Sequence, residues 1–205
     1  PEPDVVEFEA AVAVLKAAKN PVIVAGGGVH FSGATDTLKA FVEKHQIPVV
    51  ETQAGKSALA WDHGLNFGPV GVTGAESANV VSEKADLVIG VGTRFQDFTT
   101  GSWALFKNPN RKILALNVQP YDSAKHDAIP LVADAKIGLE KLSAALGDHT
   151  YAAPDAGLKA SWFAKADAVT AAPTDSNALP TDMQVIGAVQ RASRDNTVVM
   201  CAAGT

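Results

Sequence analysis

The segment PVIVAGGG, residues 21–28, decides the fold that this sequence predicts. Its first part is continuously apolar and rich in β-branched residues, as in a strand that is buried on both faces of a sheet. The glycines that follow suit a tight turn from the strand into a helix, because glycine adopts backbone conformations that other residues avoid. We therefore predict a strand that is buried on both faces and followed by a tight glycine-rich turn.

Further apolar runs of the same kind recur along the chain, and helical patterns lie between most of them. Continuously apolar strands that alternate with helices indicate a parallel sheet covered on both faces. The predicted class is α/β: a doubly wound, Rossmann-like domain of the DHS-like NAD/FAD-binding type, with a mostly parallel sheet of about five or six strands. The additional predicted strands are IPVVE (47–51), ADLVIGVG (85–92), KILALNV (112–118) and IPLVAD (129–134).

The helices of this domain are predicted from their apolar spacing and their end signals. Asp4 and Glu7 have the spacing of a capping box before an amphipathic helix over residues 5–18. Asp134 is expected to cap the last helix, which Gly147 ends. The apolar faces of the second and last helices are marked by Leu38, Phe41, Val42 and His45, and by Leu139, Leu142 and Leu146.

The chain changes character after residue 150. We predict one domain over 1–150, a connecting arm with an Ala-rich helix over 151–180, and the truncated start of another domain over 181–205. In the last part, Thr181 and Gln184 are spaced as a capping box, and NTVVMCAAGT (196–205) is expected to begin a strand. Because a helix and a single strand cannot bury a core, we expect this chain to be a piece of a longer protein.

Composition restricts the classes of function. The chain has 47% hydrophobic and 19% charged residues, which supplies enough apolar material for a core and argues against disorder. A net charge of -5, without a run of Lys or Arg, disfavours binding to nucleic acid or to an anionic membrane. With a single cysteine, Cys201, the chain forms no internal disulfide, so a cytoplasmic protein is expected, with small molecules or proteins as partners.

The glycine turn is the first candidate binding site. Gly26, Gly27 and Gly28 stand where a nucleotide diphosphate approaches backbone N–H groups in dinucleotide-binding folds. The G-x-G-x-x-G fingerprint is incomplete because its third position is Phe31, although Glu51 ends the next strand where an acid binds ribose in such folds. The alternative is that these glycines serve close packing of the turn.

The second candidate is VGTRFQDFTTGSW, residues 91–103, which follows a buried strand at the same edge of the sheet. Arg94 is suited to hold a phosphate or carboxylate with two hydrogen bonds, and Phe95 is suited to cover a ring. The alternative is an ion pair between Arg94 and Asp97 or a neighbouring domain.

Other chemistries have weak support. Gly55-Lys56-Ser57 resembles the end of a phosphate-binding loop, but the first glycine of that motif would fall on Val50. The five histidines show no paired spacing, so no metal site is predicted. No nucleophile-elbow signature is present, and we expect Cys201 to be an inert thiol, so no catalytic residue is assigned within this chain.

A longer stretch carries a family resemblance. FGPVGVTGAESANVVSEKADLVIGVGTRFQDFTTGSW, residues 67–103, resembles the middle domain of acetolactate synthase-like enzymes that use thiamine diphosphate. In that family a G-x-x-G stretch precedes an Ala-Asn helix, an Ala-Asp opens a strand, and G-x-R-F-x-D-x-x-T-G follows. More narrowly, residues 48–63 and 92–106 are similar to the trihydroxycyclohexanedione hydrolases of inositol catabolism, the branch of the family that opens a ring.

The resemblance implies a function for a parent protein. The parent is expected to be a homo-oligomeric, cytoplasmic hydrolase that breaks a C–C bond of a cyclic dione with thiamine diphosphate and Mg²⁺. This chain is then the central domain, inactive alone and missing its flanking domains, and Gly204 and Thr205 are the nearest to the cofactor diphosphate. The alternatives are a decarboxylase or carboligase of the same family, or an autonomous FAD- or NAD-binding module.

The resemblance also bears on flavin. Family members that hold FAD use the glycine turn and the G-x-R-F stretch for it, which makes FAD a possible cofactor here. Those enzymes typically show Asp and Arg where this sequence has Gln96 and Phe98, and this departure disfavours FAD.

Overall fold

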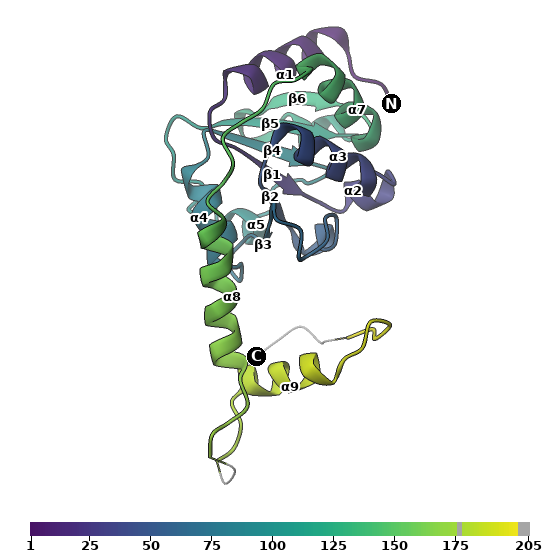
Figure 1. The fold of residues 1–205 in the computed structure, drawn as a ribbon. Coiled ribbons are helices and arrows are strands. Elements are labelled where there is room, and N and C mark those ends of the chain that lie inside the picture. Colours follow the sequence, from purple (N-terminus) through teal and green to yellow (C-terminus); the bar gives the residue numbers. More distant parts are fainter. Residues whose placement is uncertain (176–177, 201–205) are drawn as a thin grey trace. The chain divides into compact units, whose positions relative to one another are not determined.

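The computed structural model describes residues 1–175 and 178–200 (Figure 1). The chain divides into two compact units, Pro1–Lys159 and Ala160–Thr205. The first unit holds the sheet and every buried hydrophobic residue of the described chain. Across the described residues, no helix combines the length and the apolar character that crossing a membrane requires.

The first unit is built on a parallel sheet of six strands in the order β3-β2-β1-β4-β5-β6. The strand that ends at the glycine turn lies near the middle, with the next two strands in sequence on one side and the later strands on the other. The order therefore reverses between β1 and β4, which makes their carboxyl ends the switch point of a doubly wound sheet. The strands are β1 (Pro21–Ala25), β2 (Val49–Glu51), β3 (Asn66–Pro69), β4 (Leu87–Val91), β5 (Lys112–Asn117) and β6 (Ile129–Val132).

Helices connect these strands, and the predicted α/β class is confirmed. Those of the first unit are α1 (Val5–Ala17), α2 (Gly28–Phe31), α3 (Thr35–His45), α4 (Glu76–Lys84), α5 (Asp97–Thr100), α6 (Pro120–Ser123) and α7 (Ala135–Leu146), with the 3-10 turns η1 (Gln53–Gly55) and η2 (Lys125–Asp127). α8 (Ala156–Thr170) begins in the first unit, and α9 (Asp182–Ala192) belongs to the second.

The core follows from the alternation of side chains along the strands. Ile23 and Ala25 of β1 belong to a buried cluster that also contains the apolar faces of α1, α3 and α7. Val22 and Val24 point to the opposite side of the sheet and are fully buried there. Both faces of the central strand are therefore covered, which explains why its sequence is continuously apolar.

Most of the predicted helix ends are confirmed, with one difference. The Asp134 carboxylate accepts hydrogen bonds from the N–H groups of residues 136 and 137, and Gly147 ends α7. Asp4 caps α1 in the same way, but the Glu7 carboxylate does not complete a capping box. It accepts instead from the Val132 N–H at 2.8 Å and so joins α1 to the end of β6.

Two features differ from the sequence prediction. β3, NFGP, was not predicted because glycine and proline disfavour strands, and it forms only as an edge strand. The strand predicted from residue 196 is wrong for its described part, since residues 196–200 have no strand structure and Val198 and Met200 are exposed. An isolated extended segment has no neighbour with which to form ladder hydrogen bonds. The predicted capping box of Thr181 and Gln184 is present at the start of α9.

Candidate ligand-binding cleft

A cleft with a volume of about 420 Å³ opens at the switch point of the sheet. Its walls come from the segments that follow β1, β2, β4 and β5, together with the turn after β3. This is the edge at which open α/β sheets bind ligands. The predicted residues Gly26, Gly27, Gly28 and Arg94 all line this cleft.

The glycine turn packs directly on the turn that follows β4. A Cβ atom added to Gly28 would lie 2.6 Å from the Gly92 Cα, and one added to Gly26 would collide with the Gly92 carbonyl. Gly92 itself has a φ of +61°, in the left-handed region that favours glycine. The close approach of two backbones therefore accounts for Gly26 and Gly28, as the packing alternative proposed.

The backbone N–H groups of this turn are mostly occupied. Gly26 N–H donates to the Val91 carbonyl at 2.9 Å, and Gly28 N–H donates to the Gly92 carbonyl at 3.0 Å. The next two N–H groups, of Val29 and His30, donate back to carbonyls of the turn itself. In the described part of the chain, Gly27 alone in this turn has an N–H without a protein acceptor.

The segment after β2 forms the second wall. Thr52 N–H donates to the Ala25 carbonyl at 3.0 Å, and a Cβ on Gly55 would collide with that carbonyl. η1 is a single 3-10 turn in which Thr52 Oγ1 accepts from Gly55 N–H at 3.0 Å. The Lys56 carbonyl then contacts His30 Nε2 at 2.9 Å, so α2 and this segment are joined at the rim. The glycine of the Gly-Lys-Ser triplet serves packing against β1.

Glu51 lies away from the cleft. Its carboxylate is buried beneath the β2–β3 connection and accepts from Leu59 N–H at 3.3 Å. Burial raises the pKa of the Glu51 carboxyl, and the hydrogen bond from Leu59 partly offsets this effect. The structure therefore does not place Glu51 as a ribose-binding acid, because its side chain organises the loop that follows β2.

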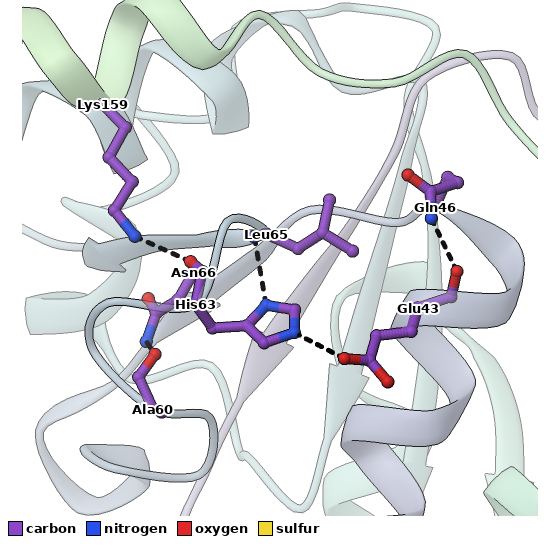
Figure 2. A network of polar contacts seen from close by, with 7 residues as sticks. All are labelled: Glu43, Gln46, Ala60, His63, Leu65, Asn66 and Lys159. Atoms are coloured by element: carbon purple, nitrogen blue, oxygen red, sulfur yellow. Dashed lines mark hydrogen bonds and ion pairs between the residues drawn. The ribbon is translucent and has the colours of Figure 1, made fainter.

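The same connection is held from outside by a polar network (Figure 2). His63 Nε2 donates to the Glu43 carboxylate at 3.0 Å, while its Nδ1 accepts from Leu65 N–H at 3.1 Å. Lys159 Nζ donates to the carbonyls of Trp61 and His63, at 3.0 and 2.7 Å. Burial lowers the pKa of Lys159. The β2–β3 connection is thus fixed both to α3 and to the first turn of α8.

Arg94 is exposed on the segment after β4, at the edge of the cleft. When the Gln96 amide is oriented with its oxygen toward Arg94, this oxygen accepts hydrogen bonds from Arg94 Nε, at 2.7 Å, and from Arg94 Nη2. Within the described residues, Arg94 forms no ion pair with Asp97. The neutral partner leaves the positive charge of Arg94 available to an anion.

Phe95 turns inward from the same segment. Its ring is 3% exposed, packs over Gly90 and lies 5.6 Å from the Trp103 ring. Its φ of +50° lets the chain direct Arg94 and Gln96 to the cleft on either side of a buried ring. Phe95 is therefore placed to shape this segment, and its binding role stays a prediction.

Two exposed aromatic side chains at the cleft were not predicted as ligand contacts. Phe31, at the end of α2, is 95% exposed, and Phe98, in α5, is 56% exposed. An exposed phenylalanine keeps apolar surface in water, which costs free energy unless a ligand covers it. The sequence did mark both residues. Phe31 stands in place of the third glycine of the G-x-G-x-x-G fingerprint, and Phe98 stands where FAD-binding family members typically have Arg.

The described residues offer no cluster of side chains for the metal ion expected with thiamine diphosphate. They contain no group of three or more His, Cys, Asp or Glu side chains able to hold a metal ion. The predicted cofactor contacts Gly204 and Thr205, like Cys201, lie outside the described residues.

FAD does not fit the cleft well either. Its diphosphate would need converging N–H donors at the glycine turn, where only that of Gly27 is free among the described residues. Gln96 is engaged with Arg94, and Phe98 presents an apolar ring in place of a hydrogen-bond donor. The two residues that disfavour FAD, Gln96 and Phe98, therefore occur together with a glycine turn that has too few free N–H groups to bind a diphosphate.

Comparison with known proteins agrees with the family resemblance seen in the sequence. Residues 8–142 match the family model described as thiamine pyrophosphate enzyme, central domain. The chain is 48% identical over 144 residues to a 3D-(3,5/4)-trihydroxycyclohexane-1,2-dione hydrolase of Clostridium tetani (strain Massachusetts / E88), a match that covers 70% of this chain and 22% of that protein. It is 47% identical over 151 residues to the same-named hydrolase of Geobacillus thermodenitrificans (strain NG80-2), covering 74% and 23%. The chain therefore spans less than a quarter of the length of these relatives.

Proposed function

Because this chain belongs to the thiamine pyrophosphate enzyme family as its central domain, we propose that its parent is a thiamine diphosphate-dependent hydrolase that opens a trihydroxycyclohexanedione ring. The observation that carries the proposal is the 48% identity to a protein with that printed activity, over 144 residues. Family membership alone does not determine the reaction. The high identity to a ring-opening hydrolase favours ring opening over decarboxylation or carboligation.

The proposed role of the chain is structural. Its first unit offers a rigid sheet, and the loops after β2 and β4 are packed tightly on that sheet. Such a domain holds the flanking catalytic domains in register and presents fixed loops to the cleft between them. The proposed division into a central domain (1–150), an arm (151–180) and the start of the cofactor-pyrophosphate domain (181–205) follows the family resemblance.

The remaining parts of the proposal concern the parent. We propose that it binds thiamine diphosphate with Mg²⁺, acts on a cyclic dione in the cytoplasm and assembles as a homo-oligomer. Gly204 and Thr205 are proposed as contacts to the cofactor diphosphate. In the first unit, Gly27 and Arg94 are the predicted binding residues with an N–H or a charge available to a ligand.

The test is an activity measurement on the full-length protein that contains this chain. With trihydroxycyclohexanedione, thiamine diphosphate and Mg²⁺, we expect a product heavier than the substrate by one water, detected by mass spectrometry. No turnover is expected without thiamine diphosphate or from the 205-residue chain alone. Acetolactate formation from pyruvate, with the dione left unchanged, would support the carboligase alternative.

A further inference from the structure

We propose that the β2–β3 connection, residues 52–65, contains a binding site for a primary ammonium ion, which Lys159 of α8 occupies as a built-in ligand. The occupied site acts as a latch that couples the order of this connection to the docking of the first turn of α8. All residues of the latch lie in the first unit. The proposal is independent of the ring-opening chemistry proposed for the parent.

The connection contains a turn whose backbone carbonyls accept from side-chain donors. Asn66, at the start of β3, is buried, and its Nδ2 donates to the carbonyls of Leu59 and Ala60 at 3.0 and 3.3 Å. Its Oδ1 accepts from Gly68 N–H at 2.8 Å, which fixes the orientation of the amide. The amide of Asn66 therefore holds the first part of the turn, and the carbonyls at 61 and 63 are the ones that meet Lys159.

Lys159 supplies the second donor to the same turn. Its Nζ donates to the carbonyls of Trp61 and His63 at 3.0 and 2.7 Å, and Figure 2 shows the side chain extending from α8 to this connection. An ammonium group has three donors and no acceptor, and carbonyl oxygens are suitable ligands for a cation. Burial lowers the pKa of Lys159, and the negative charges of Asp62 and Glu51 act in the opposite direction. Carbonyls and carboxylates thus favour a cation at this place.

The arm is attached to the first unit at two points. Tyr151 is the first, because its N–H donates to the His45 carbonyl at 3.0 Å and its hydroxyl donates to the Leu15 carbonyl at 2.7 Å. Residues 152–155, which follow, form no helix or strand, and α8 itself buries no side chain. The hydrogen bonds of Lys159 therefore form a second, polar attachment, beyond a short segment without regular structure.

The connection links this attachment to the end of β2 and to α3. The carbonyl of His63 accepts from Lys159, while its imidazole Nε2 donates to the Glu43 carboxylate at 3.0 Å. In the same turn, Leu59 N–H donates to the buried carboxylate of Glu51 at 3.3 Å. Withdrawal of Lys159 would leave two carbonyls of this turn without their charged donor and so loosen the turn. Because coupling between two sites is reciprocal, a looser turn would also release the start of α8.

Amide hydrogen exchange of the 205-residue chain, followed by NMR, tests the latch. In Lys159→Ala, we expect exchange of the Leu59 and Leu65 amides, and of the amides at 160–163 in α8, to accelerate by about tenfold or more. Lys16→Ala removes an exposed lysine from the last turn of α1 and is the matched control. It should change these rates by less than about twofold. Acceleration in α8 with an unchanged connection would overturn the coupling.

Chemical rescue tests whether the site recognises an ammonium ion. Propylammonium replaces the atoms from Cγ to Nζ that Lys159→Ala removes. At about 50 mM it should slow exchange in both regions of the variant at least twofold, as expected for a dissociation constant of about 50 mM or less. It should not affect the unsubstituted chain, whose site is occupied. Tetramethylammonium has the same charge without an N–H donor and should not slow exchange. Equal effects of the two ions, or no slowing by propylammonium, would overturn the ammonium site.

A variant outside the arm tests the coupling from the other side. Glu43→Ala removes the acceptor of the His63 imidazole from α3 and leaves α8 unchanged. We expect faster exchange of the Leu65 amide, whose acceptor is His63 Nδ1, and an acceleration of about threefold or more at 160–163. A faster Leu65 amide with unchanged rates in α8 would contradict the latch. None of these results depends on whether the parent opens a dione ring.

Discussion

At the level of single residues, the contact between Gly28 and Gly92 sets the geometry of the cleft. It brings the turn after β1 against the turn after β4, and it uses the N–H groups that would otherwise face a ligand. In Rossmann-type sites the glycines let a pyrophosphate approach the backbone. Here another strand's turn occupies that place, so the same residue type serves packing within the protein.

This interpretation predicts that Gly28→Ala destabilises the chain. The new Cβ would lie 2.6 Å from the Gly92 Cα, where no flexible side chain exists to yield. We expect a loss of about 1 to 3 kcal/mol in the free energy of unfolding, the usual cost of overpacking. Gly64→Ala is the matched control, because a Cβ there has no neighbour within 4 Å, and it should change stability by less than about 0.5 kcal/mol. Urea denaturation of both variants measures the difference, and equal stabilities would contradict the packing role.

Residue positions along the sequence were predicted better than side-chain directions. Glu51 ends β2 as expected, yet its carboxylate turns toward Leu59 N–H in a loop whose path depends on the edge strand β3. Phe95 follows β4 as expected, but it packs on Gly90 and Trp103. Both directions are decided by tertiary neighbours, which a local motif does not encode.

At the level of secondary-structure elements, a histidine joins the end of α3 to the segment that follows α7. His45 Nδ1 donates to the His149 carbonyl at 2.6 Å, and Nε2 accepts from Ser143 Oγ at 3.2 Å. Tyr151, two residues after His149, extends this junction. Its hydroxyl donates a hydrogen bond to the Leu15 carbonyl at 2.7 Å. Three helices of one face of the sheet are thereby linked around a fully buried imidazole.

Burial lowers the pKa of His45 from its usual value of 6.5, although the hydrogen bond to the His149 carbonyl acts in the opposite direction. The folded state then binds this proton less readily than the unfolded state. Stability from this group is fully present above the unfolded pKa and is lost as pH falls below about 6.5 toward the folded pKa. We therefore expect the free energy of unfolding to decrease on acidification through this range.

Urea titrations at a series of pH values measure this effect. His45→Gln should unfold more easily at neutral pH and should show a shallower dependence on pH below about 6.5. His30→Gln, which removes an exposed imidazole, is the control and should retain the slope of the original chain. If the slope persists in His45→Gln, another titrating group causes it.

The elements were predictable to the extent that local chemistry determines them. The buried faces of α3 and α7 and the cap at Asp134 were expected from spacing alone, and they are confirmed. β3 was not, because NFGP becomes a strand only through pairing with β2. Glu7 has capping-box spacing, but its carboxylate binds Val132 N–H, which is more than a hundred residues away in sequence. Long-range partners override local patterns in both cases.

At the level of the whole molecule, the two units differ in what stabilises them. All buried hydrophobic residues of the described chain belong to the first unit, and the last of them is Tyr151. Within the second unit, α9 packs on the end of α8, where Gly187 lies close to the Thr170 carbonyl. The same carbonyl accepts a hydrogen bond from the Arg191 guanidinium at 2.8 Å. Met183, Ile186 and Val189 of α9 remain about half exposed or more. Hydrophobic burial is the main favourable term in folding, so the second unit adds little stability of its own.

We predict that a chain ending at Ala164, which keeps Lys159 within the first turns of α8, unfolds with the same free energy as the whole chain, within about 0.5 kcal/mol. The reason is that the described residues among those removed contribute no buried apolar side chain, whereas the contacts of Lys159 with Trp61 and His63 are retained. Lys159→Met in the shortened chain tests those contacts separately and should destabilise it by about 1 to 3 kcal/mol, since two backbone carbonyls lose a charged donor. Limited proteolysis of the whole chain should cut the second unit first and leave a stable core that ends near residue 160. A loss of more than about 2 kcal/mol on truncation would mean that the second unit contributes to the packing of the first.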